Sequence, residues 1–525
     1  MGVSVPDKFG WRAMSSNLDR VCVVIGRTRH KMVAMEMQEA GRLGAKMIEI
    51  RLDYISRAPD FKRLLDKKPC PIVATLRRRE DGGRWNGAED LRQTLLRQCV
   101  VGGFDWIDLE WDIAEKIRRF GDVKRIVSYH NLECVPDNLE HIYEQMCRMD
   151  ADVVKLAVAA QQPSDNLRIL KLVQNSKKAT VAHCMGDIGF PSRILALMYG
   201  APFIYAAFNP ERTIAPGMPS MHELQTVYPL ARLDRDSKVY GVIGDPVAQS
   251  MSPLLHNKLF DRHKINSVYL PFRVPRGQLS SFTDAFAELP VHGYSVTIPH
   301  KEGAAALASE PDEFVKQTRA ANTLLRLANG KFGAANTDYQ AVLDAILEAL
   351  PPNPDGTAGT LNGKMVLLLG AGGVGRSIAH ALKRSGCVLT IANRTSQRAH
   401  ALAAELDCRV LEWMGRHIGT CDILINATSV GMHPNVDDTP LHAGFLQPGM
   451  VVFDTVYNPE STVLIKDARE RNCRVVTGIE MFVRQAARQF EMFTDVSPDL
   501  EQMRQIVRRA LSPVTRPMDD EDASA

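Results

Sequence analysis

Residues 364–376 read KMVLLLGAGGVGR, an apolar run that leads directly into a glycine-rich turn. The glycines permit a tight turn and let a pyrophosphate approach the N-terminus of the apolar helix expected next. A lone G-x-G-x-x-G motif is weak evidence, but a strand, these glycines and a helix in order predict a dinucleotide-binding Rossmann lobe. The residues expected to contact the dinucleotide in this turn are Gly370, Ala371, Gly372, Gly373, Val374 and Gly375.

The second strand of this lobe indicates which dinucleotide binds. It is expected at 388–392 and is followed by Asn393, Arg394 and Thr395 rather than by an acid. An Asp or Glu there would hold a free ribose hydroxyl, whereas an arginine suits a 2′-phosphate. The sequence therefore predicts NADP.

The first half of the chain alternates strand-like runs with amphipathic stretches. Eight such alternations within about 210 residues predict a (β/α)8 barrel, although a doubly wound open sheet would look similar strand by strand. The strand-like runs are 21–25, 47–52, 72–76, 106–109, 125–128, 153–158, 180–184 and 203–207. Helical stretches are expected at 31–43, 89–101, 139–149, 166–173 and 192–199. The fold class is thus α/β throughout.

Lys155 lies in the middle of the apolar run 153–158. A buried ammonium loses hydration, and a lysine that is partly neutral is a nucleophile toward ketones. The alternative is a lysine that extends to solvent or pairs with a carboxylate. Its setting favours chemistry, because a barrel places active groups at the C-terminal ends of its strands, and polar residues gather there. They are Glu49, Arg51, Arg77, Glu110, His130, Lys155 and Arg193.

These types suit an imine mechanism. An imine on Lys155 would acidify the carbon beside a substrate ketone, and His130 could move protons near neutrality. The arginines offer planar forks for a carboxylate, their alternative being surface ion pairs.

The composition of the chain limits which class of protein it can be and which partners it can have. The chain has 525 residues, too many for one core, with 45% hydrophobic and 24% charged residues. A net charge of +3 gives no sign of a nucleic-acid or membrane partner. Ten cysteines without a C-x-x-C pair indicate reduced thiols, with no disulfide frame and no metal site. With no convincing targeting segment in residues 1–20, a cytoplasmic location is expected.

The barrel residues resemble the type I 3-dehydroquinate dehydratases over about residues 20–230. The matching pieces are Glu49 to Asp53, Thr75 to Arg77 before Asp81-Gly82-Gly83, Ser128 to Asn131, Lys155, Pro191-Ser192-Arg193 and Ala215-Pro216-Gly217. The resemblance implies a Schiff base on Lys155 and acid–base work by His130. It also implies substrate binding by Glu49, Arg51, Arg77, Asp81 and Arg193. Three positions depart, since the family usually has Glu at Asp81, Ser at Ile214 and Gln at Met218.

The second half carries a separate set of polar residues. Ser250 and Ser252 stand where a helix begins and could bind an anion, or simply cap the helix. Lys301 and Asp338 follow separate strands and could form a proton-transfer pair for alcohol–ketone redox, or a structural ion pair.

These pieces resemble shikimate dehydrogenase over about residues 239–511. The resemblance implies Lys301 and Asp338 as the catalytic pair. It implies substrate contacts by Ser250, Ser252, Thr297, Asn322, Tyr457 and Gln485, and it adds Gly478 to the cofactor residues.

The expected organisation is an N-terminal extension (1–20), a dehydratase-like barrel (21–235), a substrate lobe (239–340), a Rossmann lobe (341–478), C-terminal helices (479–511) and an acidic tail (512–525). Pro351 to Gly356 reads as a flexible insertion. The expected function is dehydration of 3-dehydroquinate to 3-dehydroshikimate, followed by NADPH-dependent reduction to shikimate. The alternatives are a second half that acts on quinate, or a non-enzymatic metabolite sensor with a decayed barrel. The sequence is silent on oligomeric state.

Overall fold

A computed structural model describes residues 16–212, 214–353, 356–417 and 420–512. Most of the predicted N-terminal extension, nearly all of the acidic tail and part of the 351–356 insertion lie outside these residues. The chain forms two compact units, one ending at Val291 and the other beginning at His292. Among the described residues, no helix combines the length and the apolar character needed to cross a membrane.

The first unit contains an eight-stranded parallel sheet. Its strands are β1 (Val21–Ile25), β2 (Met47–Arg51), β3 (Ile72–Thr75), β4 (Trp106–Glu110), β5 (Lys124–Asn131), β6 (Val153–Ala159), β7 (Thr180–Met185) and β8 (Ile204–Ala207). They pair in the order β7-β6-β5-β4-β3-β2-β1-β8. In a doubly wound sheet β1 would pair with β2 and with another early strand, such as β4. Here the strands follow one another from β1 to β7, and the second partner of β1 is the last strand, β8. The predicted barrel is therefore confirmed, with a seam between β7 and β8, where no ladder forms within these described strands.

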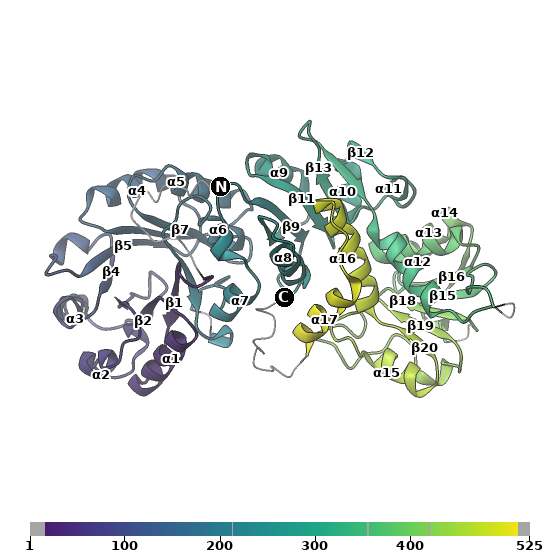
Figure 1. The fold of residues 1–525 in the computed structure, drawn as a ribbon, viewed down its shortest axis with the longest axis horizontal. Helices are drawn as coiled ribbons and strands as arrows, with labels where there is room; N and C mark the ends of the chain where they lie inside the picture. Colours follow the sequence, from purple (N-terminus) through teal and green to yellow (C-terminus); the bar gives the residue numbers. More distant parts are fainter. Residues whose placement is uncertain (1–15, 213, 354–355, 418–419, 513–525) are drawn as a thin grey trace. The chain divides into compact units, whose positions relative to one another are not determined.

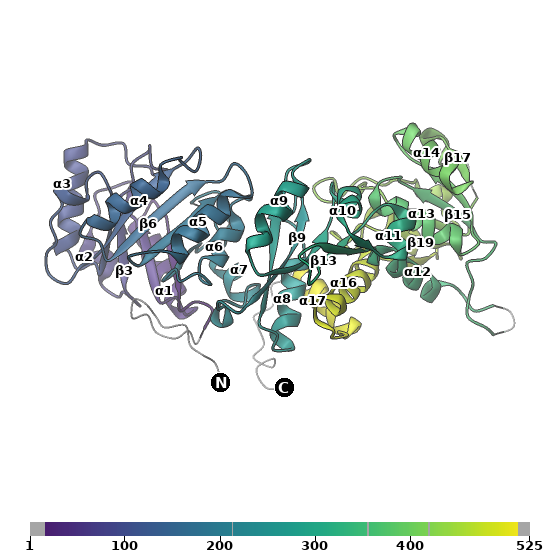
Figure 2. The same cartoon turned by 90° about the horizontal axis from the view of Figure 1, so that it is seen from above.

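Helices cover the outside of the strand ring, as Figures 1 and 2 show for α3, α4 and α5. The helices of this part are α1 (His30–Arg42), α2 (Phe61–Leu65), α3 (Glu89–Val101), α4 (Leu139–Arg148), α5 (Asp165–Gln174), α6 (Phe190–Leu195) and α7 (Met221–Thr226). The helix expected at 192–199 is wrong in its bounds, because α6 begins earlier and ends at Leu195. Beyond it, Leu197 and Met198 donate to carbonyls three residues back, which tightens the chain into turns.

The barrel interior is filled below the strand ends by inward-facing apolar side chains. Successive residues of a strand face opposite sides, so every second residue contributes to this filling. The cluster comprises Cys22, Val24, Met47, Val73, Trp106, Ile126, Val153, Ala179, Val181, Phe203 and Tyr205. It forms a floor, and the space above it at the C-terminal strand ends is where a barrel carries its active groups.

After the barrel, the first unit continues with β9 (Lys238–Gly244), α8 (Ser252–Arg262), β10 (Ser267–Arg273) and α9 (Leu279–Ala285). β9 and β10 pair in parallel, with Tyr240 opposite Tyr269. The boundary between the two units falls at β11 (Val291–Val296), inside the range expected for the substrate lobe.

The second unit begins with a mixed sheet. β11 pairs antiparallel with β13 (Thr323–Arg326), which pairs antiparallel with β14 (Phe332–Ala335), and β12 (Glu310–Pro311) pairs in parallel with β14. The helices between and after these strands are α10 (Lys301–Leu307), α11 (Glu313–Thr318) and α12 (Thr337–Ala349).

The second unit then forms the predicted Rossmann lobe. Its parallel strands are β15 (Met365–Leu369), β16 (Val388–Ala392), β17 (Arg409–Leu411), β18 (Ile423–Asn426), β19 (Val451–Asp454) and β20 (Arg474–Val476). They pair in the order β17-β16-β15-β18-β19-β20, the doubly wound order of dinucleotide-binding sheets.

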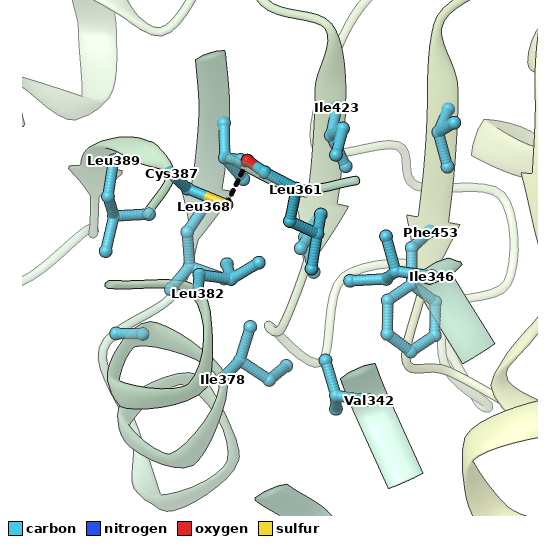
Figure 3. Packing of buried hydrophobic residues seen from close by; sticks show 14 of the residues in the cluster. Val342, Ile346, Leu361, Leu368, Ile378, Leu382, Cys387, Leu389, Ile423 and Phe453 are labelled. Carbon is cyan, nitrogen blue, oxygen red and sulfur yellow. Dashed lines mark hydrogen bonds between the residues drawn. The ribbon is translucent and has the colours of Figure 1, made fainter. Parts of the chain in front are cut away.

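Helices pack on this sheet. They are α13 (Gly373–Arg384), α14 (Ser396–Leu406), α15 (Val463–Glu470), α16 (Gly478–Thr494) and α17 (Leu500–Leu511). Figure 3 shows one face of the core, where Leu382 and Ile378 of α13 lie on the side of Leu368 of β15. In the same view Ile346 of α12 lies beside Phe453 of β19. The packing holds the glycine turn between β15 and α13 in place.

Candidate active sites

A cavity of about 330 Å³ lies at the C-terminal ends of the barrel strands. Most of the polar residues predicted for the barrel site line it together. They are Glu49, Arg51, Arg77, Asp81, His130 and Lys155. Its other walls include Ala157, Ala159 and the loop residues Ile214, Ala215, Pro216 and Met218. A volume of this size fits a small ring-shaped metabolite.

Lys155 is buried, as predicted, with 6% of its surface exposed. Its ammonium also has the carboxylate partners that the sequence left as an alternative. Nζ donates to Asp108 Oδ2 at 3.0 Å and lies 3.6 Å from Glu49 Oε2. The Tyr205 ring lies beneath it, with Nζ 4.1 Å from the ring centroid. The lysine is thus held in one position, with its nitrogen at the cavity wall.

Asp108 connects Lys155 to Arg77. Its second oxygen, Oδ1, lies 2.6 Å from Arg77 Nη2 and accepts from Ser128 Oγ at 2.6 Å. Burial alone would raise the pKa of Asp108, but Arg77 and Lys155 outweigh it and hold that pKa well below its usual range. Asp108 therefore remains a carboxylate and fixes both cations.

Arg77 is likewise held by buried carboxylates. Burial would lower its pKa, yet Asp108 and Glu110 together raise it. Arg77 Nη1 donates to Glu110 Oε1 at 2.9 Å, and Arg92 holds the other oxygen of Glu110 at 2.7 Å. Glu110 thus orients an arginine instead of facing the cavity.

His130 follows Ser128 on β5, so both side chains point toward the barrel interior. Burial, with Arg77 and Lys155 nearby, lowers the pKa of His130 well below its ordinary value. The expectation of a histidine titrating near neutrality is therefore wrong for this site, because burial and the nearby cations disfavour the charged ring. His130 is a neutral imidazole, whose Nδ1 is buried without a hydrogen-bond partner in the described structure. Such a ring can accept a proton.

Asp81 lies at the cavity wall but pairs with Arg78, whose Nε donates to it at 2.7 Å. Burial raises the pKa of Asp81, with Arg78 acting in opposition. The loop opposite carries Ile214 and Met218, which pack against the apolar cluster of the barrel interior. Its Gly217 has φ +65°, and a Cβ there would meet the Gly186 carbonyl at 2.5 Å, so this close approach requires glycine.

Two further arginines predicted for this site, Arg51 and Arg193, differ in how many of their donors already have a partner. Arg51 already has a carboxylate partner, because its Nε and Nη2 donate to the two oxygens of Asp53 at 2.9 and 2.8 Å. Arg193 lies behind the lining residues, and Nη2 donates to the Pro216 carbonyl at 3.1 Å. Burial lowers its pKa to about 10, and its Nε and Nη1 have no partner in the described structure. Arg193 thus keeps two donors for an anion.

Sequence reasoning missed four residues of this site: Asp108, Ser128, Tyr205 and His183. Asp108 and His183 each carried the signal that identified Lys155, a polar residue inside a buried strand. Tyr205 looked like ordinary core, and only the register of β1 against β8 places it beneath Lys155.

A second site is built in the other unit around Lys301 and Asp338. Lys301 begins α10 and Asp338 lies in the first turn of α12, and both are buried. Lys301 Nζ donates to Asp338 Oδ2 at 2.5 Å. A Cβ built on Gly373 would lie 3.3 Å from Lys301 Cδ, so the lysine stem passes against the glycine turn. The predicted proton-transfer pair is thus adjacent to the predicted cofactor turn.

Asn322 is near this pair. Its Nδ2 donates to Thr337 Oγ1 at 2.9 Å and lies 3.5 Å from Gln485 Oε1. Tyr457 stacks on Phe482, one turn from Gln485 on α16. These three predicted substrate residues belong to one unit, with Gln485 on α16, Asn322 directly before β13 and Tyr457 three residues after β19.

The remaining predicted substrate residues are Thr297, Ser250 and Ser252. Thr297 follows β11, where its carbonyl accepts from His300 N. Ser250 and Ser252 belong to the first unit, where Ser250 lies in the turn after β9 and Ser252 is the first residue of α8. Ser250 Oγ accepts from Ser252 N at 3.3 Å. Ser250 thus supports the start of α8, although the N-cap itself is Met251.

The glycine turn has the shape that a dinucleotide requires. Gly370 has φ +111°, and a Cβ there would meet the Ala427 carbonyl at 2.6 Å. A Cβ added at Gly372 would meet nothing within 4 Å, so the backbone there is open to a ligand. Asn393 supports the turn, because its Oδ1 accepts from Ala371 N at 3.1 Å and its Nδ2 donates to the Thr395 carbonyl.

Two more cofactor residues flank the turn. Arg394 is exposed at the end of β16, where it is free to meet a phosphate. Gly478 begins α16, and a Cβ there would collide with the Val456 carbonyl, which explains the glycine. The residues present therefore fit a phosphorylated dinucleotide.

Four family models match the chain in order. They are type I 3-dehydroquinase (residues 21–235), shikimate dehydrogenase substrate binding domain (242–324), shikimate/quinate 5-dehydrogenase (355–442) and shikimate 5′-dehydrogenase C-terminal domain (478–508).

Individual relatives match either nearly the whole chain or about half of it. The bifunctional 3-dehydroquinate dehydratase/shikimate dehydrogenase, chloroplastic, of Arabidopsis thaliana is 34% identical over 522 residues, covering 96% of this chain and 86% of that protein. The NADP(+) shikimate dehydrogenase of Bacillus cereus (strain 03BB102) is 37% identical over 281 residues, 52% of this chain and 99% of its own. A crystal structure of shikimate 5-dehydrogenase from Thermus thermophilus, in complex with NADP(H) and shikimate, is 31% identical, covers 52% of this chain and 99% of that chain, and has a TM-score of 0.47.

Proposed function

Because the chain belongs to the family of bifunctional 3-dehydroquinate dehydratase/shikimate dehydrogenases, we propose that its two sites catalyse consecutive steps. The barrel dehydrates 3-dehydroquinate to 3-dehydroshikimate, and the second half reduces that product to shikimate with NADPH. One observation carries the proposal for the barrel: the nitrogen of a buried lysine faces a cavity, with a neutral imidazole on the neighbouring strand.

In the barrel, the Lys155 ammonium gives a proton to the neutral His130 ring, and the freed Nζ attacks the substrate ketone. The proton returns to the ketone oxygen, which leaves as water to form a protonated imine. The imine withdraws electrons, so the adjacent carbon can lose a proton to His130. That electron pair forms the new double bond as the hydroxyl on the next carbon leaves as water, with the proton that His130 has taken up. Hydrolysis of the imine returns Lys155 and releases the enone. Arg193, with two unpartnered donors, binds the substrate carboxylate, and Glu49, Arg51, Arg77 and Asp81 shape the rest of the site.

In the second site, NADPH supplies a hydride to the ketone carbon when it is bound. Lys301 then gives a proton to the resulting alkoxide, and Asp338 orients the ammonium at 2.5 Å. Within the second unit, Asn322, Gln485, Tyr457 and Thr297 hold the substrate's hydroxyls and carboxylate. Ser250 and Ser252 of the first unit remain predicted substrate contacts. The glycine turn and Gly478 hold the dinucleotide, with Arg394 at the 2′-phosphate and Asn393 and Thr395 beside it.

Borohydride trapping tests the imine. Adding borohydride during turnover of 3-dehydroquinate should leave the ligand covalently on Lys155, because a reduced imine is stable. Peptide mapping locates the adduct. Lys155→Ala should abolish both trapping and dehydration while reduction of 3-dehydroshikimate continues. An adduct on another lysine, or none during fast turnover, would refute the mechanism.

Two alternatives remain to be weighed. A metabolite sensor has no need of all four of these residues: Lys155, His130, Lys301 and Asp338. The barrel cavity is also open, with a volume of about 330 Å³. Quinate and shikimate share the ring, the carboxylate and hydroxyls, and steady-state kinetics with each alcohol will discriminate between them. We propose shikimate as the preferred product.

The remaining proposals concern organisation. We propose the same domain boundaries that the sequence predicts. We also propose that the chain binds small-molecule substrates and has neither a nucleic-acid nor a membrane partner. A cytoplasmic location is supported by the ten cysteines, all of which are free thiols. The name of the Arabidopsis relative states a chloroplast location for that protein.

A further inference from the structure

Strands β5, β6 and β7 carry two histidines at the same level of the barrel. In the ladder, His130 is opposite Ala157, and Ala157 is opposite His183. Neighbouring strands lie about 4.8 Å apart, so the two histidine backbones stand roughly 10 Å apart. Lys155 lies two residues before Ala157, on the same face of β6. Two imidazoles therefore flank the cavity above Lys155, with only a methyl group between them.

His183 lines the cavity and is 7% exposed. Its ring lies beside Tyr205, with 6.4 Å between the ring centroids. No hydrogen bond joins it to any residue of the described structure, so both ring nitrogens are available to a ligand. A buried polar group with no protein partner at a cavity wall is expected to have one in the bound ligand.

The charges around the two histidines differ. Asp108 faces His130 and partly offsets the cations there. Around His183 the nearby charges are Arg193 and Lys155, both cations. Burial, with these two cations, lowers the pKa of His183 well below its ordinary value. No carboxylate is among them, so a proton on this ring would not be stabilised. The ring is a neutral donor and acceptor, suited to a hydroxyl group.

We propose that His183 is a substrate-binding residue of the barrel site, which hydrogen-bonds a ring hydroxyl of the substrate on the wall opposite His130. This inference rests on the dehydratase function proposed above and deepens it. It assigns proton transfer to His130 alone and recognition of a hydroxyl to His183. Sites that hydrogen-bond a substrate hydroxyl reject ligands that lack it, so His183 also contributes to specificity.

Substitutions at His183 test the proposal. His183→Leu keeps the approximate volume but removes both hydrogen-bonding atoms, and KM for 3-dehydroquinate should rise about 10- to 100-fold, as when a buried polar group loses its partner. kcat and its pH profile should change less than about threefold. His183→Asn keeps a neutral donor and acceptor and should restore KM to within about fivefold of wild type. His141→Leu, on an exposed helical position of the same barrel, is the matched control.

Each outcome decides the proposal. A wild-type KM in His183→Leu would overturn it. A fall in kcat with a lost limb of the pH profile would assign His183 to proton transfer and overturn it too, as would a failure of His183→Asn to restore KM. Borohydride trapping on Lys155 at saturating substrate should persist in both variants. If wild type itself gives no adduct, the imine mechanism fails, while the KM comparison still judges His183 by itself.

Discussion

Replacing Asp108 with Asn should destabilise the barrel far more than an ordinary surface change does. The Asp108 side chain is fully buried and lies 2.6 Å from Arg77 and 3.0 Å from Lys155. An asparagine keeps the shape but leaves two buried cations with less countercharge. Removing one partner of a buried ion pair costs about 3–5 kcal/mol. Because each 1.4 kcal/mol is a factor of ten, local opening should become roughly 150- to 5,000-fold more frequent.

Hydrogen exchange followed by mass spectrometry measures this opening region by region. Peptides covering β4, β5 and β6 should lose protection in Asp108→Asn, whereas peptides covering β15 and β18 should exchange at the wild-type rate. Asp150→Asn is the matched control, because Asp150 pairs with Arg119 at 2.8 Å but is 58% exposed. Exposed pairs contribute at most about 1 kcal/mol, so its barrel should exchange nearly as in wild type.

The pH dependence gives a second check on the same charge. Since the folded pKa of Asp108 is lowered, its stabilisation is present above the unfolded value of about 3.9 and is lost as the pH falls toward the folded value. The gap between wild type and Asp108→Asn should therefore shrink below about pH 4. A loss of protection under tenfold at pH 7, or a gap that widens in acid, would refute the account of Asp108 as the central countercharge.

Three further predictions concern the second unit. Lys301→Met should lower kcat for reduction by roughly 10²–10⁴-fold while NADPH binding and dehydration persist, so 3-dehydroshikimate accumulates from 3-dehydroquinate; a raised KM with unchanged kcat would assign Lys301 to binding. Asn393→Asp should shift the kcat/KM preference from NADPH toward NADH by repelling the 2′-phosphate, and equal use of NADH by wild type would contradict the role given to Arg394. Burial raises the pKa of Asp454 to about 6, so the stabilisation from its protonated form is present below about pH 4 and lost as pH rises through 6; exchange protection of β19 should follow this curve and become flat in Asp454→Asn.

The sequence predicted the barrel strands within about three residues at each end because each is a short apolar run between turn-forming segments. Helix α6 was less predictable. Its residues are all buried, so the amphipathic period that marks a helix end is missing, and packing decides where the chain turns. The Rossmann lobe was predictable from one glycine turn between a strand and a helix. The steric demands of that turn are local, so they are visible in the sequence.

The candidate sites were only partly predictable for a different reason. Lys155 and His130 are visible as polar residues in or after apolar strands. Their partner Asp108 lies on β4, two strands from Lys155, so their contact crosses the barrel interior and depends on register. Electrostatics depend on the same geometry. The low pKa of His130 arises from burial and from the nearby Arg77 and Lys155. The depth of burial and the distances to these two cations depend on the closed barrel, so the sequence alone does not give them.

The chain places two buried lysines beside carboxylates, and their surroundings assign them different chemistry. Lys155 shares Asp108 with Arg77, and its nitrogen faces a cavity lined by Ala157 and the Tyr205 ring. That space admits a ketone to the nitrogen, which suits bond formation. Lys301 has Asp338 at 2.5 Å, and its stem passes against Gly373, where the dinucleotide is proposed to bind. Asp338 fixes the Lys301 nitrogen beside the glycine turn, which suits proton donation to a substrate bound there. The nitrogen of Lys155 faces the barrel cavity, whereas the nitrogen of Lys301 is paired with Asp338. We therefore expect lysine to serve as a nucleophile in the first unit and as an acid in the second.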